Sequence, residues 1–401
     1  MEGAQTKRLI PKFMFSHFSH HVATGVLVPL LPLLRESFGL NYFQSGILVS
    51  SFSLAYGIGQ VPMAILADRF SRRLIIILGL VGVSIAGILV SFTRAFWQMV
   101  PFFVLMGLLG GTYHAPASSF ISQSIPGDKR GRALGMHVTG GSASFLLTPA
   151  MALGIASVFE SWRPSFFILA LPALVAGAVI WFTTTEPADF PGPVRGQEDL
   201  KGGSDAFQEG EKSQITWFEI IRAIGVLVCI TITMNVVFAS INSYLPLYMV
   251  DHHGISPKWA GIVVSLIAGA GIIGSPIGGA LSDRLGRKEL ILFSLALSGP
   301  LLFAITKSPP WIPLILSLFF YGLTISSRMP TTESLIADVV PVGRRTTVLG
   351  VYFFMSMETS GVVTPIIGRL LDRYDLDPVF TGIAVGMCVI ALVALLFRRW
   401  I

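Results

Sequence analysis

The feature that most constrains this chain is a succession of apolar segments separated by short charged turns. Each segment holds about 20 residues, which is the length that a helix needs to cross the hydrocarbon core of a bilayer. Backbone polar groups inside that core must be satisfied within the segment, so such runs fold as helices. Only 12% of the residues are charged, against about 25% in an ordinary soluble domain. The sequence therefore predicts an all-α membrane protein with many spans.

We expect twelve transmembrane helices. Their predicted ranges are 13–34, 44–66, 74–93, 96–122, 133–157, 165–185, 218–248, 258–281, 289–306, 312–338, 346–370 and 379–397. Several of these ranges contain glycine and proline, which membrane helices tolerate because neighbouring helices satisfy the backbone groups that are released. The two cysteines, Cys229 and Cys388, both lie inside apolar segments and give no disulfide or metal-ligand spacing.

The two halves of the chain repeat one another. The charged turn 282–288 has a counterpart at 67–73, and Asp283 follows Asp68 by 215 residues. The same offset relates Gly46 to Gly261, Pro126 to Pro341, and Gly135 to Gly350. An offset that holds over several segments indicates an internal duplication. Each half therefore carries one such turn, after its second apolar segment.

A single long polar stretch divides the two halves. Residues 186–216 are rich in glycine, proline and charged side chains, and such a composition forms a flexible linker rather than a packed core. We predict an N-terminal six-helix bundle over 1–185, a cytoplasmic linker over 186–216, and a pseudo-symmetric C-terminal six-helix bundle over 217–401.

The distribution of basic residues predicts the topology. If the N-terminus is cytoplasmic, 20 lysines and arginines fall on the cytoplasmic side and 7 on the outer side. Because cytoplasmic loops carry the excess of basic residues, both termini are expected in the cytoplasm of a multi-pass protein of the cell membrane. The same excess accounts for the net charge of +6 without a nucleic-acid partner.

The charged turns resemble the signature of the major facilitator superfamily, and the resemblance extends over nearly the whole chain. The signature is a glycine, three residues, an acid, a base, two residues and two bases. The second turn matches it at Gly279, Asp283, Arg284, Arg287 and Lys288. The first turn matches at Asp68, Arg69, Arg72 and Arg73, with Ala64 and Ser71 in place of the usual glycines. The resemblance implies secondary transport of a small solute by alternating access, for which a monomer suffices.

A second resemblance is narrower. The segments 110–116 and 140–142, with Ser16-His17 at the start of the first helix, are similar to the fosmidomycin-resistance-type efflux proteins. Those proteins carry His-Pro-Glu in the fourth helix, whereas this chain has His114-Ala115-Pro116-Ala117, so no proton role of that acid carries over. The resemblance favours export, with protons as the exchanged ion.

Arg328 is the one arginine or lysine that lies deep inside a predicted span, away from its ends. A charge there costs about 2.5–3.5 kcal/mol on insertion scales and usually serves a function. Glu358 lies at a similar depth in the following span. Three interpretations stay open: Arg328 binds an anionic group of the substrate, Glu358 carries the proton, or the two form a permanent structural ion pair.

Histidines and amides supply further candidates within the spans. Histidine titrates near neutral pH and suits a proton relay, although the alternative is that these side chains only form hydrogen bonds. His17, His20 and His21 cluster at the start of the first span, but without a nearby acid or cysteine we predict no metal site. The predicted substrate contacts are Arg328, His114, Asn235, Asn242, Tyr352, His21 and Thr24, and the predicted proton-coupling residues are Glu358, His114 and His137.

The charged turns imply a gate. In the family that the turns resemble, they hold the cytoplasmic side closed in one of the two conformations. Glu333 and Asp338 approach the same side at the end of one span and are expected to pair with nearby arginines. The predicted gate residues are Asp68, Arg69, Arg73, Asp283, Arg284, Arg287, Glu333 and Asp338.

These observations favour a secondary active transporter of a small organic solute, with proton-coupled efflux as the first hypothesis. The main alternative is uptake or exchange of an organic anion bound by Arg328. A membrane sensor without transport is less favoured, because the short termini and the linker offer no signalling domain. Motifs of the P-loop, GxSxG and HExxH types are absent from the sequence, so we expect neither an enzyme nor a cofactor.

Overall fold

The computed structural model describes residues 2–125, 127–185, 221–340, 352, 354–356, 359–396 and 398. Every regular element in this part of the chain is a helix. The first half contains α1 (Glu2–Thr24), α2 (Leu27–Phe38), α3 (Tyr42–Arg69), α4 (Arg72–Ser91), α5 (Phe96–Gly110), α6 (His114–Ser124), α7 (Gly127–Val158) and α8 (Arg163–Thr183). The second contains the π-turn η2 (Ile221–Gly225), α10 (Val226–Asp251), α11 (Pro257–Leu285), α12 (Arg287–Lys307), α13 (Ile312–Val339), α15 (Thr359–Tyr374) and α16 (Leu376–Leu396).

The all-α membrane fold predicted from the sequence is confirmed. Within the described residues, nine helical segments are long and apolar enough to cross a membrane. Two predicted spans are each divided into two helices. The first breaks into α1 and α2 at Gly25-Val26, and the fourth breaks into α5 and α6 over residues 111–113.

Proline explains both breaks. Pro29 has no N–H group with which to bond the carbonyl of Gly25, and Pro116 likewise cannot bond the carbonyl of Thr112. In each case the proline falls in the first turn of the following helix, where the missing donor costs least. The second break is important for the site, because α6 begins directly after it with His114.

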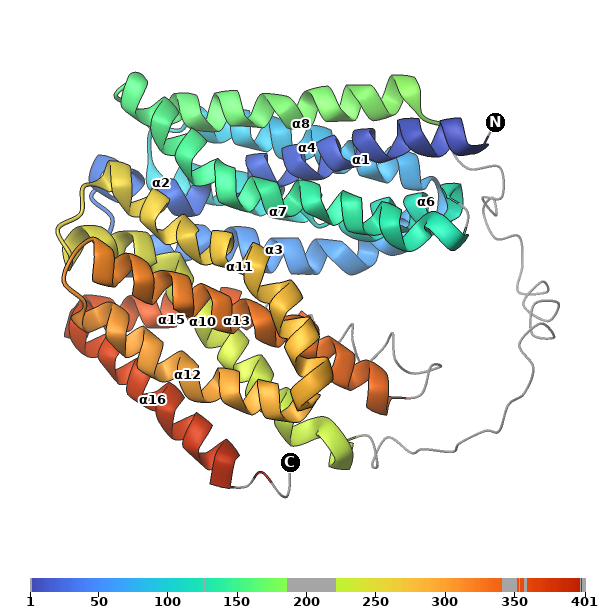
Figure 1. Ribbon diagram of the computed structural model, residues 1–401. Coiled ribbons are helices and arrows are strands. Elements are labelled where there is room, and N and C mark those ends of the chain that lie inside the picture. The colour runs from blue at the N-terminus through green and yellow to red at the C-terminus, as the bar shows by residue number, and fades with distance from the viewer. Residues whose placement is uncertain are drawn as a thin grey trace.

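The helices form two groups, α1–α8 and α10–α16, and most contacts are made within a group. Figure 1 shows the groups close together where α2 and α11 begin and splayed apart toward the end that carries both termini. The predicted linker 186–216 lies outside the described residues, so the predicted domain boundaries stay a prediction.

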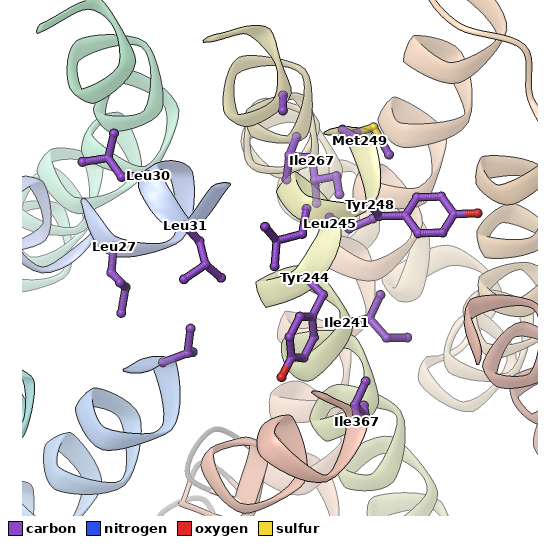
Figure 2. Packing of buried hydrophobic residues seen from close by; sticks show 14 of the residues in the cluster. Leu27, Leu30, Leu31, Ile241, Tyr244, Leu245, Tyr248, Met249, Ile267 and Ile367 are labelled. Atoms are coloured by element: carbon purple, nitrogen blue, oxygen red, sulfur yellow. The ribbon is translucent and has the colours of Figure 1, made fainter. Parts of the chain in front are cut away.

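In the described part of the chain, the two groups touch chiefly through the pairs α3 with α15, α7 with α11, and α2 with both α10 and α11. Figure 2 shows leucines of α2, among them Leu27 and Leu31, opposite Tyr244 and Leu245 of α10. All of these side chains belong to one buried apolar cluster that extends through both groups. Burial of apolar surface therefore holds the groups together at this end.

Polar bonds reinforce the same end. Asp251 of α10 accepts bonds from the guanidinium of Arg35 and from the Tyr42 hydroxyl, the latter at 2.6 Å. Asp372 of α15 accepts from the backbone N–H groups of Tyr42 and Phe43, at 2.8 and 3.0 Å. Its carboxylate thus binds the positive N-terminal end of α3. We call these five residues the latch and this end of the molecule the latched end; none of the five was a predicted site residue.

Below the latch, α3 and α15 approach closely enough for their backbones to touch. Ser50 Oγ donates to the carbonyl of Gly361, and a Cβ atom on Gly46 would lie only 3.0 Å from Pro365 Cα. Glycine at position 46 is therefore required by the close approach. This crossing ties the two groups together directly beneath the latch.

We expect Gly46→Ala to weaken the contact between the groups, because its added methyl group overlaps Tyr244 and Pro365. Overpacking of this kind costs about 1–3 kcal/mol. Gly154→Ala is the matched control, because a Cβ atom there meets nothing within 4 Å and alanine favours the helix. Thermal unfolding of the purified proteins measures the difference. Equal melting temperatures for the two variants would contradict the tight crossing.

We expect Asp372→Asn to shift the molecule toward separation at the latched end, because the neutral amide loses its attraction to the N-terminal end of α3. An effect of about 0.3–1 kcal/mol corresponds to an approximately two- to five-fold population change. Asp375→Asn is the control, because Asp375 is exposed and has a left-handed backbone (φ 63°) that asparagine tolerates.

The measurement is the distance between spin labels at Glu36→Cys and Lys258→Cys, with Cys229 and Cys388 replaced by serine. Positions 36 and 258 are exposed, lie in different groups and line one cavity at the latched end. Asp372→Asn should enlarge the longer-distance population relative to Asp375→Asn. Identical distance distributions would show that the carboxylate of Asp372 does not hold the groups together.

Candidate functional site

Several of the predicted site residues gather in two clusters, one in each group of helices. The arginine cluster, in the second group, consists of Arg328, Asn235, Ser298, Tyr352 and Ser356. The histidine cluster, in the first group, consists of His17, His20, His21, His114 and His137. His114 and Arg328 lie 214 residues apart, one residue short of the 215-residue offset of the repeat, so a polar cluster surrounds each of two nearly corresponding positions.

Arg328 of α13 is fully buried. Its Nη2 donates to Asn235 Oδ1 at 2.7 Å, and its Nη1 lies 3.5 Å from Ser298 Oγ, at the limit of a hydrogen bond. Its Nε has no hydrogen-bond partner within the described part of the chain. The structure thus gives hydrogen-bond partners to two of the five guanidinium N–H groups, and both partners are neutral side chains.

Asn235 connects Arg328 to the remainder of the cluster. Its amide oxygen accepts from the guanidinium, and its amide nitrogen donates to Tyr352 at 3.2 Å and to Ser356 at 3.4 Å. The structure therefore brings together three of the predicted substrate contacts, namely Arg328, Asn235 and Tyr352. Their role in binding stays a prediction.

The charge of Arg328 lacks a carboxylate counterpart among the residues that the structure describes. Glu358, the predicted partner, lies outside them. A buried guanidinium loses its hydration, and neutral hydrogen bonds replace only part of that loss. A buried cation within a span, with neutral groups as its described partners, is the feature expected of a functional site.

The histidine cluster joins three helices. His17, His20 and His21 come from α1, His114 begins α6, and His137 lies in α7. The ring centroids of His17, His21 and His114 form a nearly equilateral triangle, with sides of 4.8, 5.1 and 5.1 Å. The rings of His17 and His137 stack with their centroids 4.2 Å apart.

Backbone carbonyls fix the orientation of two of these rings. His17 Nδ1 lies 2.8 Å from the carbonyl of His137, and His137 Nδ1 lies 3.0 Å from the carbonyl of Phe13. A carbonyl only accepts, so both Nδ1 atoms carry hydrogen. Gly141 makes room for the His17 ring, because a Cβ atom there would lie 2.6 Å from Cε1 of that ring. The ring is therefore held on two sides.

Two predicted contacts make no hydrogen bond to a side chain of either cluster that the structure gives. Thr24 Oγ1 donates to the carbonyl of His20, one turn earlier on its own helix. Asn242 lies two turns from Asn235 on α10, and its side-chain oxygen is buried without a partner among the described residues. Both residues stay predictions as substrate contacts.

The predicted gate is described only in part. Arg73 donates to the carbonyl of Trp181 and lies over its ring at 5.1 Å. Arg287 donates to Ser282 Oγ at 2.9 Å, whereas Arg284 is exposed and Glu333 is half-buried. The side chains of Asp68, Arg69, Asp283 and Asp338 lie outside the described residues. The gate role therefore stays a prediction.

Sequence reasoning missed several polar residues of the two clusters. Ser298 and the fully buried Tyr321 lie near Arg328, and Tyr113 packs against His20 with ring centroids 4.8 Å apart. The sequence did contain a signal for Ser298. Ser294 and Ser298 lie four residues apart in an apolar span, and this spacing places both hydroxyls on one helix face.

Two cavities in the described part of the molecule lie away from both clusters. One of about 460 Å³ opens at the latched end, lined by residues that include Glu36, Trp162 and Lys258. It contains none of the predicted site residues. The chemistry of the two clusters, rather than this cavity, identifies the candidate site.

Comparison with characterised proteins supports a transporter. The chain is 27% identical to the multidrug resistance protein MdtG of Yersinia enterocolitica over 322 residues, which cover 78% of this chain and 74% of that protein. It is 28% identical to MdtG of Escherichia coli strain K12 over 323 residues, covering 78% and 76% of the two chains. These relatives are membrane transporters and not enzymes.

Solved structures show the same fold. A bacterial homologue of the human lysosomal transporter Spinster, in an inward-facing and occupied conformation, superposes with a TM-score of 0.80 at 17% identity, over 99% of this chain and 97% of that one. A peptide transporter of the POT type bound to alafosfalin gives 0.78 at 16% identity, over 97% and 94%. The family model described as Major Facilitator Superfamily matches residues 13–357 and 227–400. The chain therefore belongs to the Major Facilitator Superfamily of membrane transporters.

Proposed function

We propose that this protein exports small organic solutes in exchange for protons, by alternating access of a central site to the two sides of the membrane. The observation that carries the proposal is the fully buried Arg328, whose described hydrogen-bond partners are neutral. A buried cation of this kind marks the solute or coupling site of a transporter. The multidrug resistance proteins among the relatives favour export.

The arrangement of the two groups of helices supports alternating access. Among the described residues, the polar bonds between the groups join them at the latched end and along the α3–α15 crossing beneath it. With both termini in the cytoplasm, as the distribution of basic residues predicts, the latched end faces outward and this conformation faces inward. Transport then requires the latch to break and the predicted gate at the other end to form.

Proton coupling is the finer part of the proposal. The titratable groups within the predicted spans include five imidazoles in the first group and Glu358 in the second. A proton on either set changes the charge near the solute site, and solute binding in turn changes the affinity for the proton. We assign the proton first to Glu358, with His114 and His137 as further carriers.

Uptake or exchange of an organic anion is the second candidate. The neutral partners that the structure describes around Arg328 favour it, because a guanidinium bound only to neutral groups is ready to bind a carboxylate or phosphate group in two-point contact. The two candidates share the site and differ in the charge of the solute and in the direction of transport. A sensor without transport is supported by no feature of the described helices.

Ligand-induced thermal stabilisation of the purified protein separates the two candidates, because a ligand that binds the folded state raises its apparent stability. The library contains organic anions, cations and neutral drugs, at about pH 5.5 and about pH 7.5, on either side of the ordinary histidine pKa. Stabilisation by amphipathic drugs at the higher pH supports proton-driven export. Stabilisation by carboxylates or phosphorylated compounds at both pH values supports anion transport.

We expect Arg328→Ala to abolish transport, because the variant loses the only cation of the arginine cluster. If the solute is anionic, its affinity should fall about 10- to 100-fold, the effect of losing a charged hydrogen bond. Arg328→Lys retains the charge but not the two-pronged geometry, so it should recover part of the binding. Flux into proteoliposomes measures transport. Wild-type flux in Arg328→Ala would contradict the assignment of the central site.

We expect Glu358→Gln to remove the dependence of transport on a pH gradient while leaving exchange of labelled for unlabelled solute intact. The amide has a similar shape but carries no titratable proton. Flux is measured with and without a pH gradient, and Glu160→Gln at an exposed turn serves as control. Unchanged gradient dependence in Glu358→Gln would transfer the proton role to the histidines.

A further inference from the structure

We propose that His17, His21 and His114 form a binding site for a divalent transition-metal cation of the class of Zn²⁺, Co²⁺ and Ni²⁺. One ligand nitrogen from each of the three rings lies within 4.8 Å of the other two. The inference goes beyond the proposed function, because it concerns binding of an ion and does not require that the protein export anything.

The spacing suits a small cation after a minor adjustment. Nitrogen ligands lie about 2.0–2.1 Å from Zn²⁺, so two ligands of a tetrahedral site are roughly 3.3 Å apart. Closing the observed triangle to that size requires side-chain movements of about an ångström. Three imidazoles leave the fourth position open to water or to a donor atom of another ligand.

The orientation of His17 provides an independent argument. Its Nδ1 carries hydrogen, because it lies 2.8 Å from the carbonyl of His137. In the neutral ring, Nε2 then presents a lone pair, and this atom is buried without a hydrogen-bond partner in the described part of the molecule. The side chain as a whole is only 6% exposed. A ring that donates to a carbonyl through one nitrogen and offers the other is typical of a metal-binding histidine.

His20 supplies a second independent observation. Its side chain is fully buried, and neither of its ring nitrogens has a partner among the described residues. Its ring centroid lies 5.1 Å from that of His21 and 5.4 Å from that of His114. Buried polar atoms without hydrogen-bond partners are rare. Here the two atoms are the ring nitrogens of His20, a fourth imidazole beside the triangle. His20 is therefore an additional candidate ligand.

The donor set determines the class of ion. All four rings are nitrogen donors, and imidazole suits Zn²⁺, Co²⁺, Ni²⁺ and Cu²⁺, whereas Mg²⁺ and Ca²⁺ prefer oxygen. From the sequence we predicted no metal site, because no acid or cysteine lies near the three histidines of the first span. The fold changes that interpretation, because the break before α6 brings His114 to the rings of α1.

The test measures metal binding to the full chain, purified without a histidine tag in detergent micelles. Titration with Co²⁺ alone, followed by its visible absorption, reports nitrogen coordination, and calorimetry compares Zn²⁺ with Mg²⁺. We expect one tightly bound Zn²⁺ or Co²⁺ per chain and no comparable binding of Mg²⁺. His21→Ala and His114→Ala should each weaken binding at least about 100-fold, since even outer-shell changes cost about 10- to 100-fold.

His253→Ala is the matched control. His252 and His253 form the other histidine pair, and their Nε2 atoms already face the carbonyls of Thr306 and Ile305. The change should leave the affinity unaltered. Gly141→Ala tests the geometry without removing a ligand, because its methyl group displaces the His17 ring; binding should weaken about 10- to 100-fold. Melting of each metal-free variant verifies that it is folded.

Several outcomes would overturn the site. They are equal affinities for Zn²⁺ and Mg²⁺, a Co²⁺ spectrum that His21→Ala and His114→Ala both leave unchanged, or a loss of binding caused by His253→Ala. If the histidine variants do not fold, X-ray absorption of the Zn²⁺-loaded wild-type protein decides, because the site requires at least three imidazole ligands. None of these measurements depends on transport, so a negative result would leave the proposed function standing.

Discussion

The structure depends on one constraint, which is that backbone polar groups inside a bilayer must find partners within their own segment. Helices satisfy it, and the described chain contains no other regular element. The effect of this constraint is clearest at the two helix breaks, where a backbone carbonyl loses its usual hydrogen-bond partner. Pro29 and Pro116 each leave a carbonyl without its usual donor, and each stands just after a helix break. The break before Pro116 places His114 at the start of α6, opposite the rings of α1. The missing N–H group of a proline, which acts on the backbone, thus helps to bring the histidine side chains of two helices together.

The two polar clusters differ in how their partners are arranged. Arg328 makes its described hydrogen bonds with neutral groups only, so a permanent charge is held where an anion would stabilise it. The histidine rings instead contact one another and backbone carbonyls, and several of their nitrogens remain without partners among the described residues. The first cluster therefore favours a negatively charged group, and the second favours a proton or a metal cation. One duplicated fold has produced complementary chemistry at related positions.

The latch is the polar contact between the two groups that the proposed alternating access must break. Asp251 and Asp372 hold the first group of helices to the second through Arg35, Tyr42 and the N-terminal end of α3. These bonds lie at the periphery, where water replaces them at small cost, while the apolar contacts beneath them are larger in area and less directional. The alternating access that we propose requires these polar bonds to break while the two groups of helices keep their own packing.

The sequence by itself determined the class, the helical spans, the duplication and the buried charge of Arg328, because length, hydropathy and spacing follow from the bilayer and not from neighbouring helices. It also indicated that Asn235 and Tyr352 are near the site. Only the tertiary structure decided that Asn235 bonds Arg328, that five histidines from three helices share one cluster, and that Arg35, Tyr42 and Asp372 form a latch. These contacts join residues that are distant in the chain. Which face each helix turns toward its neighbours is set by packing, and no local pattern in the sequence specifies it.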